Sequence, residues 1–187
     1  MEMRQLLLGL LWIMLQVAKA ENETTTEQTR KLDFRIDRVR IHGENHFMRV
    51  AVKINENRKT FDIYVMLNRE LGSNYLLMNT RVHFKLKGAQ KFETIVELKH
   101  MDFCAFIAQY NSNSLMRHYF QKTFIFGDII ACPVRARNYT LSNVGMGDNM
   151  LPDYLLSGTY KFFTEIIEGT GEIPKVFSLQ VISTVTA

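Results

Sequence analysis

The sequence lacks the features that indicate several large classes of function. It has no run of Lys or Arg that could follow a phosphate backbone, because the densest basic cluster, residues 38–40 (RVR), lies in an alternating segment typical of a strand. No glycine-rich loop is spaced to cradle a phosphate. In residues 42–46 (HGENH) the glutamate does not directly follow the first histidine, as a zinc-protease helix requires, so we expect an exposed loop there. We therefore expect no nucleic-acid partner, no metal and no other cofactor.

A constellation of catalytic side chains is also missing. Ser114 and His118 are four residues apart, but no acid is placed to orient the histidine, and helix capping and a solvated face explain both residues. Asp102 is a single carboxylate without a partner, which is weak evidence for acid–base chemistry. These observations predict a protein that is not an enzyme.

After residue 20 no hydrophobic run is long enough to cross a bilayer, which takes about 20 residues. Before it, Arg4, an apolar block over residues 6–15 and the small-x-small site at residues 18–20 are typical of a secretory signal peptide. The rival interpretation, a membrane anchor, requires a longer block. We expect residues 1–20 to be a cleaved signal peptide, residues 21–31 a polar disordered lead, and residues 32–187 one secreted, extracellular domain.

Two sequons agree with export. Asn22 begins Asn-Glu-Thr and Asn138 begins Asn-Tyr-Thr, and both are candidate glycosylation sites. Asn22 lies in the polar lead, where a glycan is easily accommodated, whereas Asn138 lies near or within an expected strand.

The chain has two cysteines, Cys104 and Cys132. Cys104 lies in an almost continuous apolar run, residues 101–110 (MDFCAFIAQY), and could be a nucleophile, a metal ligand, a buried filler or one half of a disulfide. A catalytic cysteine needs a histidine partner, and nothing in the sequence shows that His100 faces Cys104. Because an even cysteine count in an exported chain favours a disulfide, we expect a Cys104–Cys132 bond.

Apolar and polar residues alternate with a period of two through most of the chain, which predicts an all-β fold. Segments with this alternation are residues 32–41, 47–55, 60–68, 74–88, 91–99, 159–168 and 176–185. In the first segment the alternation changes phase after Ile36, which indicates a β-bulge or a short break in the strand. Seven or eight short antiparallel strands indicate a β-sandwich or barrel.

Residues 113–124, between the cysteines, depart from this alternation. Leu115, Met116 and Tyr119 recur at helical spacing, and Ser114 is a suitable N-cap. We expect a short helical excursion between the two cysteines, with the disulfide at its base.

Five short motifs occur in order: MDFCAFI (101–107), ACPV (131–134), NYTLSNV (138–144), LP (151–152) and SGTYKFF (157–163). With them the chain resembles a family of small secreted insect proteins of uncharacterised function that includes the CheB-type chemosensory proteins. That family is similar to the ML lipid-recognition domains, such as the ganglioside activator protein. The resemblance implies an immunoglobulin-like β-sandwich whose sheets splay to hold an apolar ligand. It also implies that the family's cysteine pair corresponds to Cys104 and Cys132, and it carries over no catalytic residue.

Phenylalanine (13) and methionine (10) are abundant, and aromatic residues at strand spacing indicate either a packed core or a ligand cavity. With a cavity, we expect a secreted carrier or presenter of a hydrophobic small molecule, a lipid or pheromone-like compound, with chemosensation as the implied setting. With a filled core, we expect an extracellular interaction module that acts on a receptor or channel through its outward row Tyr75, Leu77, Arg81 and His83. For the carrier, the expected ligand-binding residues are Met78, Val82, Phe84, Phe92, Val96, Phe162 and Phe177 in the lining, and Phe103, Phe106, Tyr119 and Phe120 in a flap over the mouth.

Overall fold

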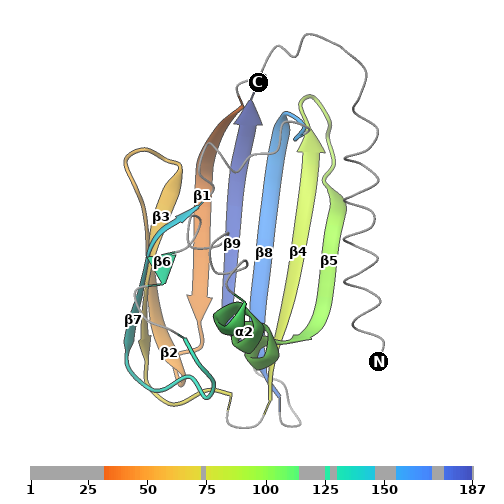
Figure 1. The fold of residues 1–187 in the computed structure, drawn as a ribbon. Helices are drawn as coiled ribbons and strands as arrows, with labels where there is room; N and C mark the ends of the chain where they lie inside the picture. The colour runs from red at the N-terminus through yellow and green to blue at the C-terminus, as the bar shows by residue number, and fades with distance from the viewer. Residues whose placement is uncertain are drawn as a thin grey trace. The chain divides into compact units, whose positions relative to one another are not determined.

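The alternating segments, together with residues 125–126 and 138–145, form two antiparallel sheets (Figure 1). The computed structural model describes residues 32–72, 75–113, 125–126, 130–145, 155–169 and 175–186. These belong to one compact unit, Lys31–Ala187. The expected signal peptide and polar lead, with Asn22, lie outside the described residues, as do Ser114, His118, Tyr119 and Phe120.

The five-stranded sheet has the order β1-β9-β8-β4-β5, and the four-stranded sheet has the order β2-β3-β7-β6. The strands are β1 (Asp33–Gly43), β2 (Met48–Ile54), β3 (Thr60–Leu67), β4 (Leu76–Leu86), β5 (Glu93–Asp102), β6 (Ile125–Phe126), β7 (Asn138–Gly145), β8 (Gly158–Glu168) and β9 (Lys175–Thr186). The sheets pack against each other through their apolar faces, which confirms the predicted all-β sandwich.

Two clusters of buried residues fill much of the space between the sheets. The first joins β1 and β9 to β3 and β7 and contains Leu32, Phe34, Ile36, Phe61, Ile63, Val144, Leu179 and Val185. The second, near the opposite ends of β3 and β9, contains Phe47, Met48, Leu67, Leu71, Leu76 and Val176. Because cross-sheet apolar contacts supply most of the folding free energy, these clusters hold the two sheets together.

Of the two alternatives predicted for the first strand, a bulge or a short break, the structure has the bulge. The register between β1 and β9 shifts between Ile36 and Arg38, so Asp37 is the extra residue. Thr184 Oγ1 donates a hydrogen bond to Asp37 Oδ2 at 2.6 Å. The bulge lets Ile36 before it and Val39 after it face the same core, although the two residues are three apart.

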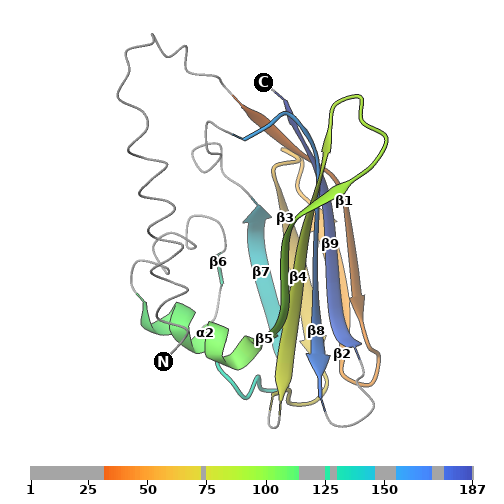
Figure 2. The same cartoon turned by 90° about the vertical axis from the view of Figure 1, so that its right-hand side faces the viewer.

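The apolar run of residues 101–110 leaves β5 and becomes helix α2 (Phe103–Ser112), which lies beside the end of that strand (Figure 2). Asp102, a lone carboxylate in the sequence, is the N-cap of α2, because its Oδ1 accepts from Ala105 N at 2.9 Å. The segment 113–124, where a helix was expected, lies almost wholly outside the described residues. No helix in the described part of the chain is long and apolar enough to cross a bilayer.

The predicted disulfide is confirmed. Cys104, in the first turn of α2, is bonded to Cys132 with an S–S distance of 2.08 Å and a sequence separation of 28. On the chain-entropy model a loop of this length contributes about 3.5 kcal/mol of stability. Gly72 packs against the bond with a φ of +81°, and a Cβ there would lie 3.1 Å from Cys104 Sγ. Both the backbone conformation and the lack of space therefore favour glycine at this position.

Candidate functional site

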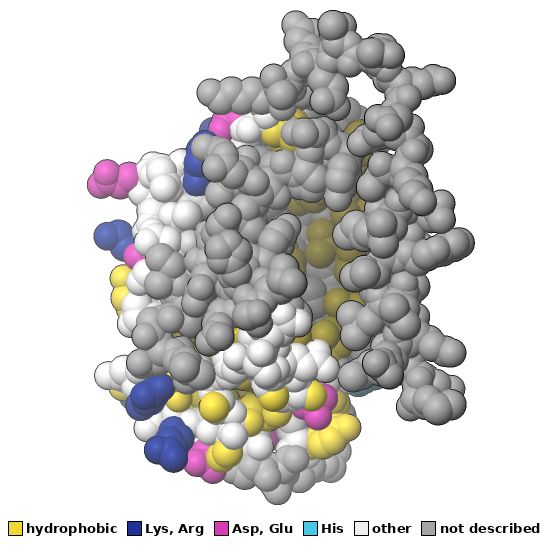
Figure 3. All heavy atoms as spheres, in the orientation of Figure 1, with side chains coloured by type: hydrophobic (Ala, Val, Ile, Leu, Met, Phe, Trp, Pro, Cys, Tyr) yellow, Lys and Arg dark blue, Asp and Glu magenta, His cyan; other side chains and the backbone are white. Residues whose placement is uncertain are grey.

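A cavity of about 230 Å³ lies between the sheets at the end where β1 begins and β9 finishes. Its lining comes from both sheets and consists of Phe34, Ile36, Phe61, Val82, Val144, Gly145, Leu155, Tyr160, Phe162, Leu179, Val181, Ser183 and Val185. We call this the first cavity. Hydrophobic side chains are visible over β8 and β4 in the space-filling view (Figure 3). Phe162 is 37% exposed and lies on the inner face of β8, so the apolar surface continues from the cavity to its rim.

The lining of the first cavity is almost wholly apolar. None of its lining residues carries a charge, and its polar side chains are those of Ser183 and Tyr160. Tyr160 OH donates a hydrogen bond to the carbonyl oxygen of Leu156 at 2.9 Å. Burial raises the pKa of Tyr160 and outweighs the opposing effect of this hydrogen bond, so the phenol stays neutral at physiological pH.

A second cavity of about 130 Å³ lies towards the disulfide. It is lined by Met48, Val65, Leu67, Leu71, Leu76, Phe103, Ile130, Val134, Tyr139, Leu141, Ile166, Val176 and Phe177. Phe103 begins α2 and Val134 follows Cys132 by two residues, so the disulfide stabilises two parts of this lining.

Two hydroxyl groups lie between the cavities. On β8, Phe162 lines the first cavity and Ile166 lines the second, and Thr164 is midway between them. Thr164 Oγ1 lies 3.0 Å from Thr80 Oγ1 on β4 and donates to the Asn79 carbonyl oxygen at 3.2 Å. This pair separates the two apolar spaces along the inner face of the five-stranded sheet.

The structure brings some of the expected ligand-binding residues together and separates others. Val82 and Phe162 line the first cavity, and Phe103 and Phe177 line the second. Phe84 is buried beside the first cavity, with its ring centroid 4.6 Å from that of Tyr160.

Met78, Val96 and Phe106 line neither cavity. Met78 faces inward between them, since it pairs with Ile166, and Val96 is an exposed neighbour of Val82 on the edge strand. Phe106 is half-buried on α2. The other two expected flap residues, Tyr119 and Phe120, lie outside the described residues.

Phe92 lies on the opposite face of the sheet from the cavities, so its expected place in the lining is wrong. The register between β4 and β5 shifts between Val82 and His83. Residues that precede the shift on the β5 side therefore lie on the face opposite to the one that their alternation with Val96 predicts. Lys85 Nζ and Lys161 Nζ lie 5.2 and 5.9 Å from the centre of the Phe92 ring. The ring therefore makes cation–π contacts on the outer surface.

Sequence reasoning missed most of the first cavity's lining, including Tyr160, Val181 and Ser183. All three lie on segments whose alternation predicts an inward face, so their direction could have been found. Which inward residues border unfilled space depends on the separation of the sheets, and no local pattern encodes that separation.

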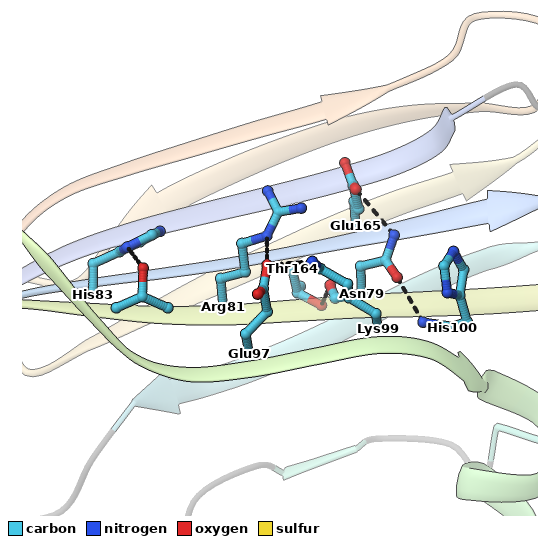
Figure 4. Close-up of polar contacts among 9 residues, drawn as sticks. Asn79, Arg81, His83, Glu97, Lys99, His100, Thr164 and Glu165 are labelled. Carbon is cyan, nitrogen blue, oxygen red and sulfur yellow. Dashed lines mark hydrogen bonds and ion pairs between the residues drawn. The ribbon is translucent and has the colours of Figure 1, made fainter.

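The outer face of the five-stranded sheet carries a polar network (Figure 4). Asn79 is its buried member. Its Oδ1 accepts from the backbone N–H of His100 at 2.8 Å, and its Nδ2 donates to Glu165 Oε1 at 3.1 Å. His100 has a φ of +54° at a second register shift of β5. Asn79 thus fixes the irregular end of the edge strand.

Two carboxylates of this network have shifted pKa values. The hydrogen bond from Lys99 lowers the pKa of Glu97, and the ion pair with Arg81 adds to that effect. Burial alone would raise the pKa of Glu165, but the 2.8 Å contact of Lys175 Nζ and the Asn79 hydrogen bond outweigh it and lower the pKa. Both carboxylates are paired in structural contacts, so neither is a free general base.

The histidines of the 42–46 segment lie at the junction of β1 and β2, and the side chains of His42 and His46 are exposed. Among the described residues, no group of three or more His, Cys, Asp or Glu side chains could hold a metal ion. Asn138, the second sequon, is the exposed first residue of β7.

Residues 78–162 match the model of a family described as a protein of unknown function, DUF1091. The matched span runs from β4 into β8, so it includes α2, both cysteines and β7. No curated protein matches the chain.

Proposed function

We propose that the protein is a secreted carrier of a small hydrophobic molecule, which it holds between its two sheets. The observation that carries this proposal is the first cavity, whose lining comes from both sheets and has no charged residue. Apolar space between packed sheets is unusual, because protein interiors normally reach the packing density of organic crystals. An apolar ligand would restore the missing contacts.

The hydrophobic effect is large enough for such binding. Each buried methylene contributes about 0.8 kcal/mol, so a chain of eight carbons gains roughly 6 kcal/mol before the cost of losing its own freedom. The second cavity offers further apolar space. The resemblance to the CheB-type chemosensory proteins and the ML lipid-recognition domains supports the same function. The expected signal peptide and the disulfide support a secreted protein.

The alternative, an extracellular module with a filled core, draws less support from the structure. Its candidate surface row is partly engaged, because Arg81 pairs with Glu97 at 2.9 Å and His83 Nδ1 lies 3.0 Å from Thr94 Oγ1. The two cavities favour the carrier.

The test compares two valines that pair across β4 and β5. Val82 lines the first cavity, whereas Val96 lies outside it. The purified wild-type protein, Val82→Phe and Val96→Phe are exposed to a total lipid extract without detergent, and their organic extracts are measured by mass spectrometry. We expect a stoichiometric apolar compound from the wild type and Val96→Phe, and at least about fivefold less from Val82→Phe because its ring occupies cavity space.

Circular dichroism spectra and melting temperatures control for folding of the two variants. An empty wild-type protein after exposure to the lipid extract would overturn the carrier. Equal loading of a folded Val82→Phe would move the ligand away from the first cavity.

A further inference from the structure

Ser183 places a hydroxyl group in the lining of an otherwise apolar cavity. It lies on β9 among the inward residues of that strand, is only 6% exposed and lines the first cavity. Its hydroxyl makes no hydrogen bond with another described residue. The hydroxyl is not among the buried side-chain atoms that are closed off without a partner, so it is open to the space of the cavity. A molecule in the cavity can therefore reach this hydroxyl and form a hydrogen bond with it.

The other polar side chain of the lining, Tyr160, makes no hydrogen bond with Ser183. Tyr160 is its direct cross-strand partner on β8, but the Tyr160 hydroxyl donates its proton to the Leu156 carbonyl oxygen. Ser183 can both donate and accept a hydrogen bond. It is thus able to bind an alcohol, an aldehyde, a ketone or an ester within the cavity.

The absence of charged residues from the lining restricts the ligand further. No cationic side chain is among the cavity's lining residues, so a carboxylate or phosphate placed there would be buried without a counter-ion. That cost is far larger than one hydrogen bond can offset. The charged residues of β8 next to the cavity, Lys161 and Glu165, face the other side of the sheet, because they alternate with the inward residues of that strand.

The size of the cavity points to a single chain. Its volume of about 230 Å³ lies below the range of about 300–1,000 Å³ that is typical of pockets for drug-sized ligands. A compound with one short hydrocarbon chain fits this space better than a two-chain lipid. The Thr80–Thr164 pair separates it from the second cavity, so a longer chain would have to pass two hydroxyl groups.

We propose that the first cavity binds a neutral, single-chain compound with one oxygen function, such as a medium-chain alcohol or ketone, and that the Ser183 hydroxyl hydrogen-bonds to that oxygen. This inference rests on the proposed carrier function and names its ligand class. Apolar burial supplies the affinity, and Ser183 supplies the preference for an oxygenated chain over a plain hydrocarbon.

The experiment uses four eight-carbon compounds: octane, 1-octanol, 2-octanone and octanoate. Each displaces the neutral fluorophore N-phenyl-1-naphthylamine from the purified protein, which gives relative dissociation constants. We expect 1-octanol and 2-octanone to bind about fivefold more tightly than octane, as one net hydrogen bond predicts, and octanoate to bind most weakly at neutral pH.

Ser183→Ala removes the hydroxyl and little else. It should abolish the preference for 1-octanol over octane while leaving the affinity for octane unchanged or slightly higher. The matched control is Ser178→Ala on the same strand, since Ser178 pairs with Glu165 on the outer face; it should keep the wild-type preference. Melting curves show whether both variants fold.

The outcomes separate this inference from the carrier function. If octane and 1-octanol bind equally well to the wild type, or Ser183→Ala keeps the preference, the carrier stands and the role of Ser183 is overturned. Tightest binding by octanoate would overturn the neutral ligand class. If the protein binds neither the fluorophore nor any of the four compounds, both proposals are overturned.

Discussion

Strands β9 and β5 belong to the same sheet and alternate in the same way, yet their apolar residues have different surroundings. On β9, Val176, Leu179 and Val185 are buried. On β5, by contrast, Val96 and Leu98 point to the same inner face but are exposed. β9 has a neighbouring strand on each side, whereas β5 is the edge. For Leu179, Val185, Val96 and Leu98 the alternation gives the face of the sheet, and the place of the strand in the sheet decides whether the side chain is buried.

One row across the sheet makes this comparison directly. Leu179 on β9 pairs with Thr164, Thr164 pairs with Thr80, and Thr80 pairs with Leu98 on β5. All four side chains therefore share the inner face. The row is apolar at both ends, but Leu179 is 8% exposed and Leu98 is 45% exposed.

The largest predicted effect comes from truncating the two ends of this row. Leu179→Ala should lower the free energy of unfolding by about 3 kcal/mol, because it removes buried contacts from the first core cluster. Leu98→Ala should lower it by less than about 1 kcal/mol, since its side chain is already largely in water. Urea unfolding followed by circular dichroism gives both values. Similar losses for the two variants would mean that another part of the protein covers β5 in solution.

The next prediction concerns the irregular edge strand. Asn79→Ala should lower the free energy of unfolding by about 2 kcal/mol, because it leaves the His100 N–H and the Glu165 carboxylate without their partner. Thr94→Ala is the matched control at the other register shift of β5, where one exposed hydrogen bond to His83 is lost. Its effect should be within about 0.5 kcal/mol. If Asn79→Ala were equally mild, the register shift at His100 would not depend on the Asn79 side chain.

Two register shifts, one in β1 and one in β5, show what the sequence could and could not predict. The phase change after Ile36 is visible in the sequence as two apolar residues three apart, and the bulge at Asp37 is there. The shift that turns Phe92 outward leaves no such sign, because Phe92, Thr94, Val96 and Leu98 continue one unbroken alternation. It arises from how β5 pairs with β4, which is a property of two strands and of no single one.

The candidate site also combines residues that the alternation of one strand predicts with residues that depend on how strands and sheets pair. Val82 and Phe162 could be placed in an apolar interior from their alternation, and they lie in the lining of the first cavity. Ser183 could not be singled out, because a serine on a strand is usually solvated. Its importance appears only when the register places it opposite Tyr160 and the sheet separation leaves space beside it.

The smallest effect is expected from two carboxylates of the outer face, Glu165 and Glu97. Burial opposes ionisation of Glu165, but the contacts with Lys175 and Asn79 hold its pKa below the usual 4.5. A lowered folded pKa means that the ionised group stabilises the fold above that pH and that this contribution is lost as the pH falls through the folded pKa. Glu165→Gln should therefore melt below the wild type at neutral pH, and the gap should close as the pH approaches about 3.

Glu97→Gln should change little at any pH, because that side chain and its partners Lys99 and Arg81 are substantially exposed. Melting temperatures from pH 7 to about 3 test both variants, and a gap for Glu165→Gln that stayed constant with pH would show that its charge does not stabilise the sheet.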